Sequence, residues 1–214
     1  MLETHSAQLV SITPNAEEQI VYMARVSNPK NQANMDTAPR LIRYLIKHKH
    51  WSPFEMASMQ VEINTTRAIA AQVLRHRSFS FQEFSQRYSD VSELSNIGLP
   101  HLRSQDLKNK QASHDDLDPE MVELMNKQIQ QIYASTFDFY EHLLYKGVAK
   151  ECARSILPLG TPTKVYMAGT LRSFIHYVQI RAAEETQLEH RLIAEDIKSI
   201  IEDQLPSVYE AAFT

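Results

Sequence analysis

The chain is poor in cysteine and glycine, with one cysteine and four glycines among 214 residues. The single cysteine, Cys152, excludes an internal disulfide and a metal cage built from cysteine alone, and it agrees with a reducing compartment. The glycines are too few and too widely spaced to form a G-x-G-x-x-G or G-x-x-x-x-G-K-[ST] phosphate loop. They are Gly98, Gly147, Gly160 and Gly169. Any nucleotide that this protein binds must therefore be held in another way.

Long apolar runs and an excess of positive charge are also missing. No run approaches the roughly 20 apolar residues of a membrane helix, and residues 1–11 lack the basic start and apolar centre of a secretion signal. The net charge of −4 argues against non-specific attraction to nucleic acid. We therefore expect a soluble, cytoplasmic protein with neither a membrane nor a nucleic acid as its partner.

The apolar content of 43% fits one globular domain over residues 1–214. Apolar periodicity and end signals predict several helices, with Thr13 capping the first and a capping box at Thr186 and Glu189 opening the last. The predicted helices cover 14–26, 36–49, 67–74, 121–147, 149–157, 171–180 and 186–205. We further expect strands over 59–65 and 163–167, extended chain over 79–89 and a surface loop over 95–119.

These elements predict an α/β fold of the α+β kind. Helices flank a mixed or antiparallel sheet, since the elements do not alternate as βαβ units and no Rossmann motif is present.

The segment 75–89 is the most informative, because three arginines, a histidine, four serines and one carboxylate fall within it. The planar guanidinium of arginine matches phosphate oxygens with two parallel hydrogen bonds, so arginines beside hydroxyls favour an anionic ligand. Ser85 and Arg87 are two residues apart, and on extended chain both side chains point toward one group. We expect that group to be a phosphate.

Other interpretations of this segment remain open at this stage. The run Arg75-His76-Arg77 also suits the negative end of the preceding helix. Phe79, Phe81, Phe84 and Tyr88 fit core packing on one strand face. Interleaved with arginine, the same aromatic residues resemble a stacking platform, so a single-stranded nucleic-acid-binding module is the alternative function.

Arg75-His76-Arg77, followed after seven residues by Ser85, is similar to the R-H-R-x7-S signature of the flavin-dependent thymidylate synthases. Four further blocks resemble that family in the expected order, and together the blocks cover roughly half of the chain. They are Ala24-Arg25-Val26-Ser27, His50 to Glu55, Ala153 to Pro158 and Leu171 to Ala182.

This resemblance implies a transferase, a methyltransferase that makes dTMP for nucleotide biosynthesis by reductive methylation of dUMP. The carbon would come from 5,10-methylenetetrahydrofolate and the electrons from NADPH through bound FAD, giving tetrahydrofolate and NADP+. It also implies the fold of the thymidylate synthase-complementing proteins, and a homotetramer whose active sites are shared between subunits.

The resemblance further implies which residues form the site. Arg181 is the expected catalytic residue, because it resembles the arginine that favours ionisation of the pyrimidine at N3. The dUMP-binding set implied by the family is Gln72, Arg75, Glu83, Ser85, Arg87, Arg154 and Arg181. The FAD-binding set is Ser52, Arg75, His76, Arg77, Glu83, Arg172 and His176.

We expect neither a protein nucleophile nor a metal. Cys152 lies on a short predicted helix, where a lone cysteine is typically a small buried apolar residue. His48 and His50 lack a third ligand nearby in the sequence, so a solvated helix end is the better interpretation.

Overall fold

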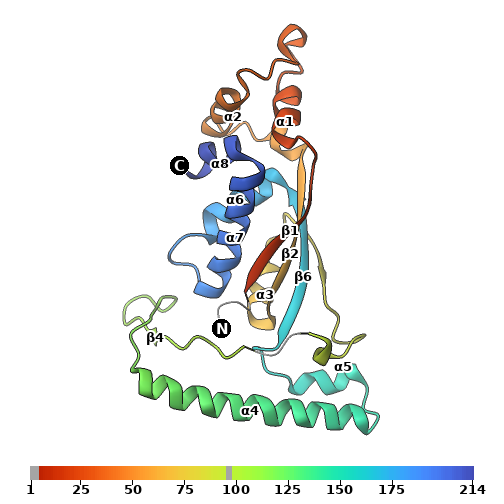
Figure 1. Ribbon diagram of the computed structural model, residues 1–214, viewed down its shortest axis with the longest axis vertical. Coiled ribbons are helices and arrows are strands. Elements are labelled where there is room, and N and C mark those ends of the chain that lie inside the picture. The colour runs from red at the N-terminus through yellow and green to blue at the C-terminus, as the bar shows by residue number, and fades with distance from the viewer. Residues whose placement is uncertain (1–4, 95–97) are drawn as a thin grey trace. The chain divides into compact units, whose positions relative to one another are not determined.

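The computed structural model describes residues 5–94 and 98–214, which form two compact units (Figure 1). The described residues of the α4 unit are 5, 64–73, 83–94 and 98–165, and those of the α7 unit are 6–63, 74–82 and 166–214. The helices are α1 (Ala16–Ala24), α2 (Ala38–Lys47), α3 (Arg67–Val73), α4 (Pro119–Tyr145), α5 (Lys150–Ala153), α6 (Leu171–Arg181), α7 (Leu188–Gln204) and α8 (Pro206–Phe213). The strands are β1 (Ser6–Ile12), β2 (Ser58–Thr66), β3 (Ser80–Glu83), β4 (Ser104–Gln105), β5 (Ser113–His114) and β6 (Pro162–Thr170).

In the α7 unit, helices bury their apolar faces against one another and against β1. Helix α7 packs on β1, α6 and α8, and α2 packs on α8, as the neighbouring ribbons in Figure 1 show. Ile193, Ile197 and Ile201 recur every four residues on α7 and are buried, which is the spacing of one helix face. The unit is thus built around the inner face of α7.

The four-stranded sheet has the order β1–β2–β6–β3. Met59, Val61 and Ile63 alternate along β2 and are fully buried, as their period of two predicts. Glu62 departs from that alternation, because it is buried as well. Its carboxylate accepts hydrogen bonds from Gln8 Nε2 at 2.9 Å and from the Tyr166 hydroxyl at 2.7 Å, as a buried charge requires.

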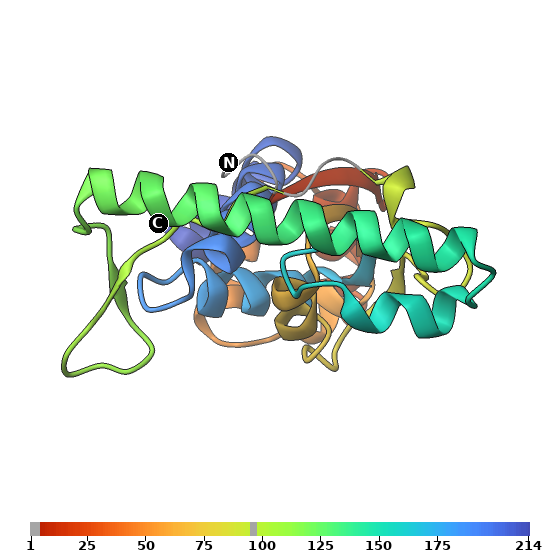
Figure 2. The ribbon, with the colours of Figure 1, turned by 90° about the horizontal axis from the view of Figure 1, so that it is seen from below.

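In the α4 unit, the long helix α4 lies alongside the short helix α5 (Figure 2). Asp118 caps α4 by accepting a hydrogen bond from the backbone N–H of Glu120, and Gly147 follows its C-terminus with a φ of +82°, a conformation that favours glycine. Val91, Tyr140 of α4 and Ala153 of α5 form a small core in this unit.

The fold class is confirmed, and the predicted helices and both predicted strands are present. Strand β1 and helix α8 are present in the structure but were not predicted. The helix caps were predicted wrongly: Asn15 precedes α1 and Gln187 precedes α7, and neither side chain caps its helix.

Two predicted irregular segments also differ from the structure. The described part of 95–119 contains the antiparallel pair β4–β5, in which Ser104 lies opposite His114; the first three residues of that range lie outside the described ones. Extended chain ends at Glu83, and residues 86–88 form a turn in which Tyr88 N–H donates to the Ser85 carbonyl at 3.0 Å.

Gly169 on β6 generates a test of the packing beside α6. A β-carbon there would lie 2.5 Å from Cδ1 of the Phe79 ring, so Gly169→Ala should lower the free energy of unfolding by about 1–3 kcal/mol through overpacking. Urea unfolding measures the loss. Adding Phe79→Leu, which removes the obstructing ring, should recover part of it; if the double variant is as unstable as the sum of the single ones, the close contact is not the cause.

Candidate functional site

Arg181, the last residue of α6, donates a hydrogen bond from Nε to Nε2 of His76 at 2.9 Å. His76 lies in the turn after α3, so the fold brings together two predicted site residues that are far apart in the chain. Because arginine remains protonated in proteins, the accepting nitrogen of His76 must carry a lone pair. The imidazole is therefore neutral, with its proton on Nδ1.

A buried pair of polar side chains lies behind His76. Tyr177 and His190 are both 0% exposed, and the His190 Nε2 and the Tyr177 hydroxyl oxygen are 3.0 Å apart. The Tyr177 ring meets the His76 ring edge to face, with 4.9 Å between centroids. Tyr177 precedes Arg181 by four residues on α6, so both point to the same side of the helix.

Burial and neighbouring cations keep these histidines neutral. Desolvation, followed by the charge of Arg181 and then by His176 and Arg75, lowers the pKa of His76 to about 4. Desolvation, Arg181 and His76 lower the pKa of His190 to about 3. Burial raises the pKa of Tyr177. The cluster thus holds one permanent cation, Arg181, among neutral rings.

A cavity of about 510 Å³ opens beside the first turns of α6, a size typical of small-molecule sites. Arg172 and His176 of the predicted FAD-binding set line it. Arg172 forms an ion pair with Glu55, and the other lining residues are Trp51, Ser78, Ser173 and Gln179. The lining thus combines an aromatic side chain, a cation paired with a carboxylate, and hydroxyl groups, which suit a flat, phosphorylated ligand.

The start of α6 is fixed by Thr170, whose Oγ1 accepts a hydrogen bond from the backbone N–H of Ser173 at 3.4 Å. This side chain is the N-cap of the helix and contributes to its stability.

Three further predicted site residues of this unit are exposed. Ser52 is the first residue of η3 (Ser52–Glu55) and is exposed. Arg75 and Arg77 are exposed on the two sides of His76.

The α4 unit holds the other predicted residues. Glu83 accepts a hydrogen bond from Thr163 Oγ1 at 3.0 Å and forms an ion pair with Arg67. Arg87 is paired with Glu151, with 2.9 Å between Nη2 and Oε2. The remaining three are Gln72 on α3, exposed Ser85 and partly buried Arg154, the first residue of η5 (Arg154–Ile156).

The aromatic run has mixed surroundings, and its members do not form one exposed platform. Phe79 packs edge to face against Phe174, with 4.9 Å between centroids, and against Tyr177 at 6.0 Å. Tyr88, by contrast, is 85% exposed. Phe79 therefore belongs to the packing behind the site, as the core-packing interpretation expects.

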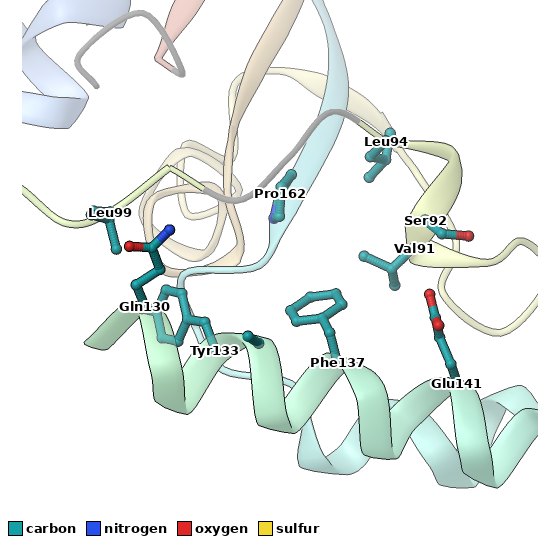
Figure 3. A pocket seen from close by; sticks show the side chains of 10 residues that line it. Val91, Ser92, Leu94, Leu99, Gln130, Tyr133, Phe137, Glu141 and Pro162 are labelled. Atoms are coloured by element: carbon teal, nitrogen blue, oxygen red, sulfur yellow. The ribbon is translucent and has the colours of Figure 1, made fainter. Parts of the chain in front are cut away.

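A second cavity, of about 430 Å³, lies in the α4 unit between α4 and η4 (Val91–Glu93) (Figure 3). Its wall is largely apolar: Tyr133 and Phe137 project from α4, facing Leu99 and Pro162. Among its described lining residues there is one carboxylate, Glu141, and no cation. It is unsuited to a phosphate, and it contains none of the predicted site residues.

Sequence reasoning missed several residues that the structure joins to the site. His190 and Tyr177 were overlooked because a buried polar side chain gives no apolar signal, although His190 falls on the buried face of α7 with Ile193, Ala194 and Ile197. The expectation of a buried cysteine was wrong, since Cys152 is exposed on α5.

The low pKa of His190 predicts that acid destabilises the protein. An unfolded histidine protonates near pH 6.5 and the folded one near pH 3, so between these values the unfolded chain binds the extra proton. The free energy of unfolding should then fall by up to about 1.4 kcal/mol per pH unit as the pH drops below 6.5.

His190→Gln retains a polar partner for Tyr177 and removes the titration. Its loss of stability between pH 7 and pH 5 should be smaller than that of the wild type by about 2 kcal/mol, measured by urea unfolding at both pH values. His142→Gln, at an exposed histidine of α4, is the control and should behave as the wild type. Equal losses in all three proteins would show that His190 is not protected from protonation.

Comparison with known proteins identifies the family to which the chain belongs. The family model described as thymidylate synthase complementing protein matches residues 8–207. The probable flavin-dependent thymidylate synthase of Paramecium bursaria Chlorella virus 1 is 49% identical over 214 residues, which is 96% of this chain and 98% of the relative. The flavin-dependent thymidylate synthase of Synechocystis sp. is 48% identical, covering 91% of this chain and 88% of the relative.

Among solved structures, the UMP/dUMP methylase PolB from Streptomyces cacaoi, bound with 5-Br dUMP, superposes with a TM-score of 0.84 at 25% identity. The match covers 97% of this chain and 93% of that one. No helix within residues 5–94 and 98–214 combines the length and apolar content needed to cross a membrane. With a family model spanning most of its length and relatives near half identity, the chain belongs to the thymidylate synthase complementing protein family, the flavin-dependent thymidylate synthases.

Proposed function

We propose that this protein converts dUMP to dTMP by reductive methylation, with a flavin as its cofactor. The observation that carries the proposal is the fixed guanidinium of Arg181, held by the histidine of the R-H-R motif. The family match and the methylase fold support the same conclusion. Glycine loops and reactive thiols are not needed for this chemistry.

Arg181 is the residue that activates the pyrimidine. A fixed cation beside the uracil ring favours loss of the N3 proton and spreads negative charge over the ring, which makes C5 a better nucleophile. Such preorganised charge stabilises the developing anion most strongly where water is excluded, and Arg181 is partly buried.

The 5′ phosphate of dUMP would be held in the α4 unit by Arg87, with Ser85 and Arg154 as further donors. Arg87 already binds an oxygen anion, the carboxylate of Glu151, with two of its nitrogens, Nε at 3.1 Å and Nη2 at 2.9 Å. A phosphate presents the same kind of acceptor with more charge. Gln72, Arg75 and Glu83 complete the proposed dUMP-binding set.

The flavin would be FAD, held by Ser52, the Arg75-His76-Arg77 run, Glu83, Arg172 and His176. The cavity beside α6 fits such a group, because Arg172 supplies a cation, Trp51 an aromatic surface and Ser173 a hydroxyl. When bound, FAD carries the reducing equivalents that the methylation consumes. The chain's own part is to bind and orient it.

The same proposal includes the co-substrates and the assembly that the family resemblance implies. NADPH would supply the electrons and 5,10-methylenetetrahydrofolate the carbon, and tetrahydrofolate and NADP+ would be released with dTMP. The active form is a cytoplasmic homotetramer whose active sites draw on several subunits. An anaerobic assay with dUMP, both co-substrates and FAD, scored by dTMP formation, tests the whole reaction.

The nucleic-acid-binding alternative is disfavoured by the packing of Phe79 against Phe174 and Tyr177, which removes this ring from any stacking platform. Titration separates the two functions. The enzyme should prefer the mononucleotide dUMP, whereas a nucleic-acid binder should bind oligonucleotides more tightly with length and lose affinity steeply with salt.

Arg181→Ala should lower the turnover at saturating substrates by about a hundredfold or more, because it removes the cation that stabilises the pyrimidine anion. The measurement is the rate of dTMP formation in the anaerobic assay. Arg43→Ala is the matched control, since Arg43 is an exposed arginine of α2 that pairs with Glu210, and it should retain full turnover. Undiminished turnover of Arg181→Ala would exclude this role.

Glu151→Gln should tighten dUMP binding by about two- to fivefold, because the exposed pair with Arg87 competes with the phosphate and is itself worth at most about 1 kcal/mol. Isothermal titration with dUMP measures the change. Glu123→Gln breaks a comparable exposed pair with Lys127 on α4 and should leave dUMP affinity unchanged. Weaker binding by Glu151→Gln would place the phosphate elsewhere.

A further inference from the structure

The guanidinium of Arg181 differs from the other paired site arginines in the kind of partner that it has. Arg87 pairs with Glu151 and Arg172 with Glu55, so a carboxylate offsets each of those charges. Arg181 instead donates to the neutral imidazole of His76. Its position is fixed by a hydrogen bond, yet its charge is not compensated by that partner.

The hydrogen bond also fixes the plane of the guanidinium. Arginine has five N–H donors in one rigid plane, and the bond to His76 uses the one on Nε. This bond therefore fixes the direction of the two terminal nitrogens and does not use their donors, which can bind a ligand. A planar ligand edge such as that of a pyrimidine can accept two parallel bonds from them.

His76 is itself held in place from behind. Its ring lies edge to face on the Tyr177 ring and near the His190 ring, with 6.1 Å between the two imidazole centroids. Tyr177 is in turn held by the 3.0 Å contact with His190 and by Phe79. A buried polar pair is seldom more stable than an apolar pair of the same shape, and its attested benefit is a unique arrangement.

We infer that His76, backed by Tyr177 and His190, is a positioning residue that holds Arg181 toward the pyrimidine while leaving its positive charge uncompensated. The inference rests on the proposed function, and it goes beyond it by assigning the Nε2 of His76 to Arg181. Only the Nδ1–H of His76 is then free to donate to a flavin. Arg75, His176 and Arg181 are the charged or titratable groups that act on this imidazole beside His190.

The test uses flavin-loaded protein and 5-fluoro-dUMP, whose fluorine NMR shift reports whether N3 is protonated without interference from flavin absorbance. The N3 pKa of the bound nucleotide, obtained by titration, should lie below that of the free nucleotide in the wild type. His76→Phe keeps a ring against Tyr177 and removes the acceptor, so the bound N3 pKa should rise by about one pH unit, a tenfold change in the ionisation constant.

Two further variants at position 76 distinguish the effect of holding the Arg181 guanidinium in place from the effect of offsetting its charge. His76→Gln offers a neutral acceptor near the place of Nε2 and should restore most of the lowered N3 pKa. His76→Glu holds the guanidinium but cancels its charge, so the N3 pKa should rise at least as far as in His76→Phe. A purely structural role for His76 predicts no such difference between the glutamine and glutamate variants.

Tyr177→Phe tests the support behind His76 and covers the case in which His76→Phe does not fold. It should also raise the N3 pKa, but by a smaller amount than His76→Phe does. Tyr140→Phe, at an equally buried tyrosine of the α4 unit, is the matched control and should leave the N3 pKa unchanged.

The outcomes distinguish this inference from the proposed function. If the wild type does not lower the N3 pKa, or if Arg181→Ala leaves it lowered, the activating role of Arg181 is wrong and the inference is overturned with it. If the lowering depends on Arg181 but is unchanged in His76→Phe and Tyr177→Phe, only the inference is overturned.

Discussion

The bond between a guanidinium and a neutral imidazole is the interaction on which the site depends. A cation placed to stabilise an anion is effective only if it is fixed and if no nearby carboxylate offsets its charge. Arg181 is fixed by a hydrogen bond to His76, a partner that accepts without carrying charge. The carboxylates that pair with Arg87 and Arg172 fix those side chains, but they also weaken the positive electrostatic field around them. Such pairs suit ligands that bring a full phosphate charge of their own, which can replace the carboxylate.

The junction of β6 and α6 positions this cation. Gly169 lets the Phe79 ring approach the strand, and Thr170 caps the helix that begins at Leu171. From there, helical spacing places Phe174, Tyr177 and Arg181 along one side, where Phe79 and His76 meet them. The motif at 75–79 and the helix at 171–181 are thus a single packed structure, although nearly a hundred residues separate them in the chain.

Much of the fold was predictable from the sequence, because most of its elements carry a periodic apolar signal. Strand β2 and helix α6 are examples. Strand β1 carries no clean alternation of buried and exposed residues, which is why it was missed. Helix α8 was missed because no element was predicted after the helix over 186–205, although Pro206 stands next and proline at the first position can start a helix.

The site was predictable as a set of residues but not as a set of contacts. Family resemblance supplied His76 and Arg181 as members of two separate motifs, and only the fold shows that one accepts a hydrogen bond from the other. Tyr177, although it lies within the block 171–182, and His190 were not among the implied site residues, and only the structure shows that their polar groups face each other in the core. The turn at residues 86–88 was missed because extended chain was predicted over the whole of 79–89, and only the structure shows that extended chain ends at Glu83.

The effects that keep the site histidines neutral also determine how stable the protein is in acid. His76 can accept from Arg181 only while it is neutral, and burial together with neighbouring cations keeps it so. Burial of His190 has the same effect on its own ring. At each of these histidines the unfolded chain binds a proton at a higher pH than the folded chain does, so a falling pH favours the unfolded chain. An apolar core at these positions would resist acid better, but it would offer Arg181 no acceptor, so the cost in acid stability follows directly from holding the cation without a counter-charge.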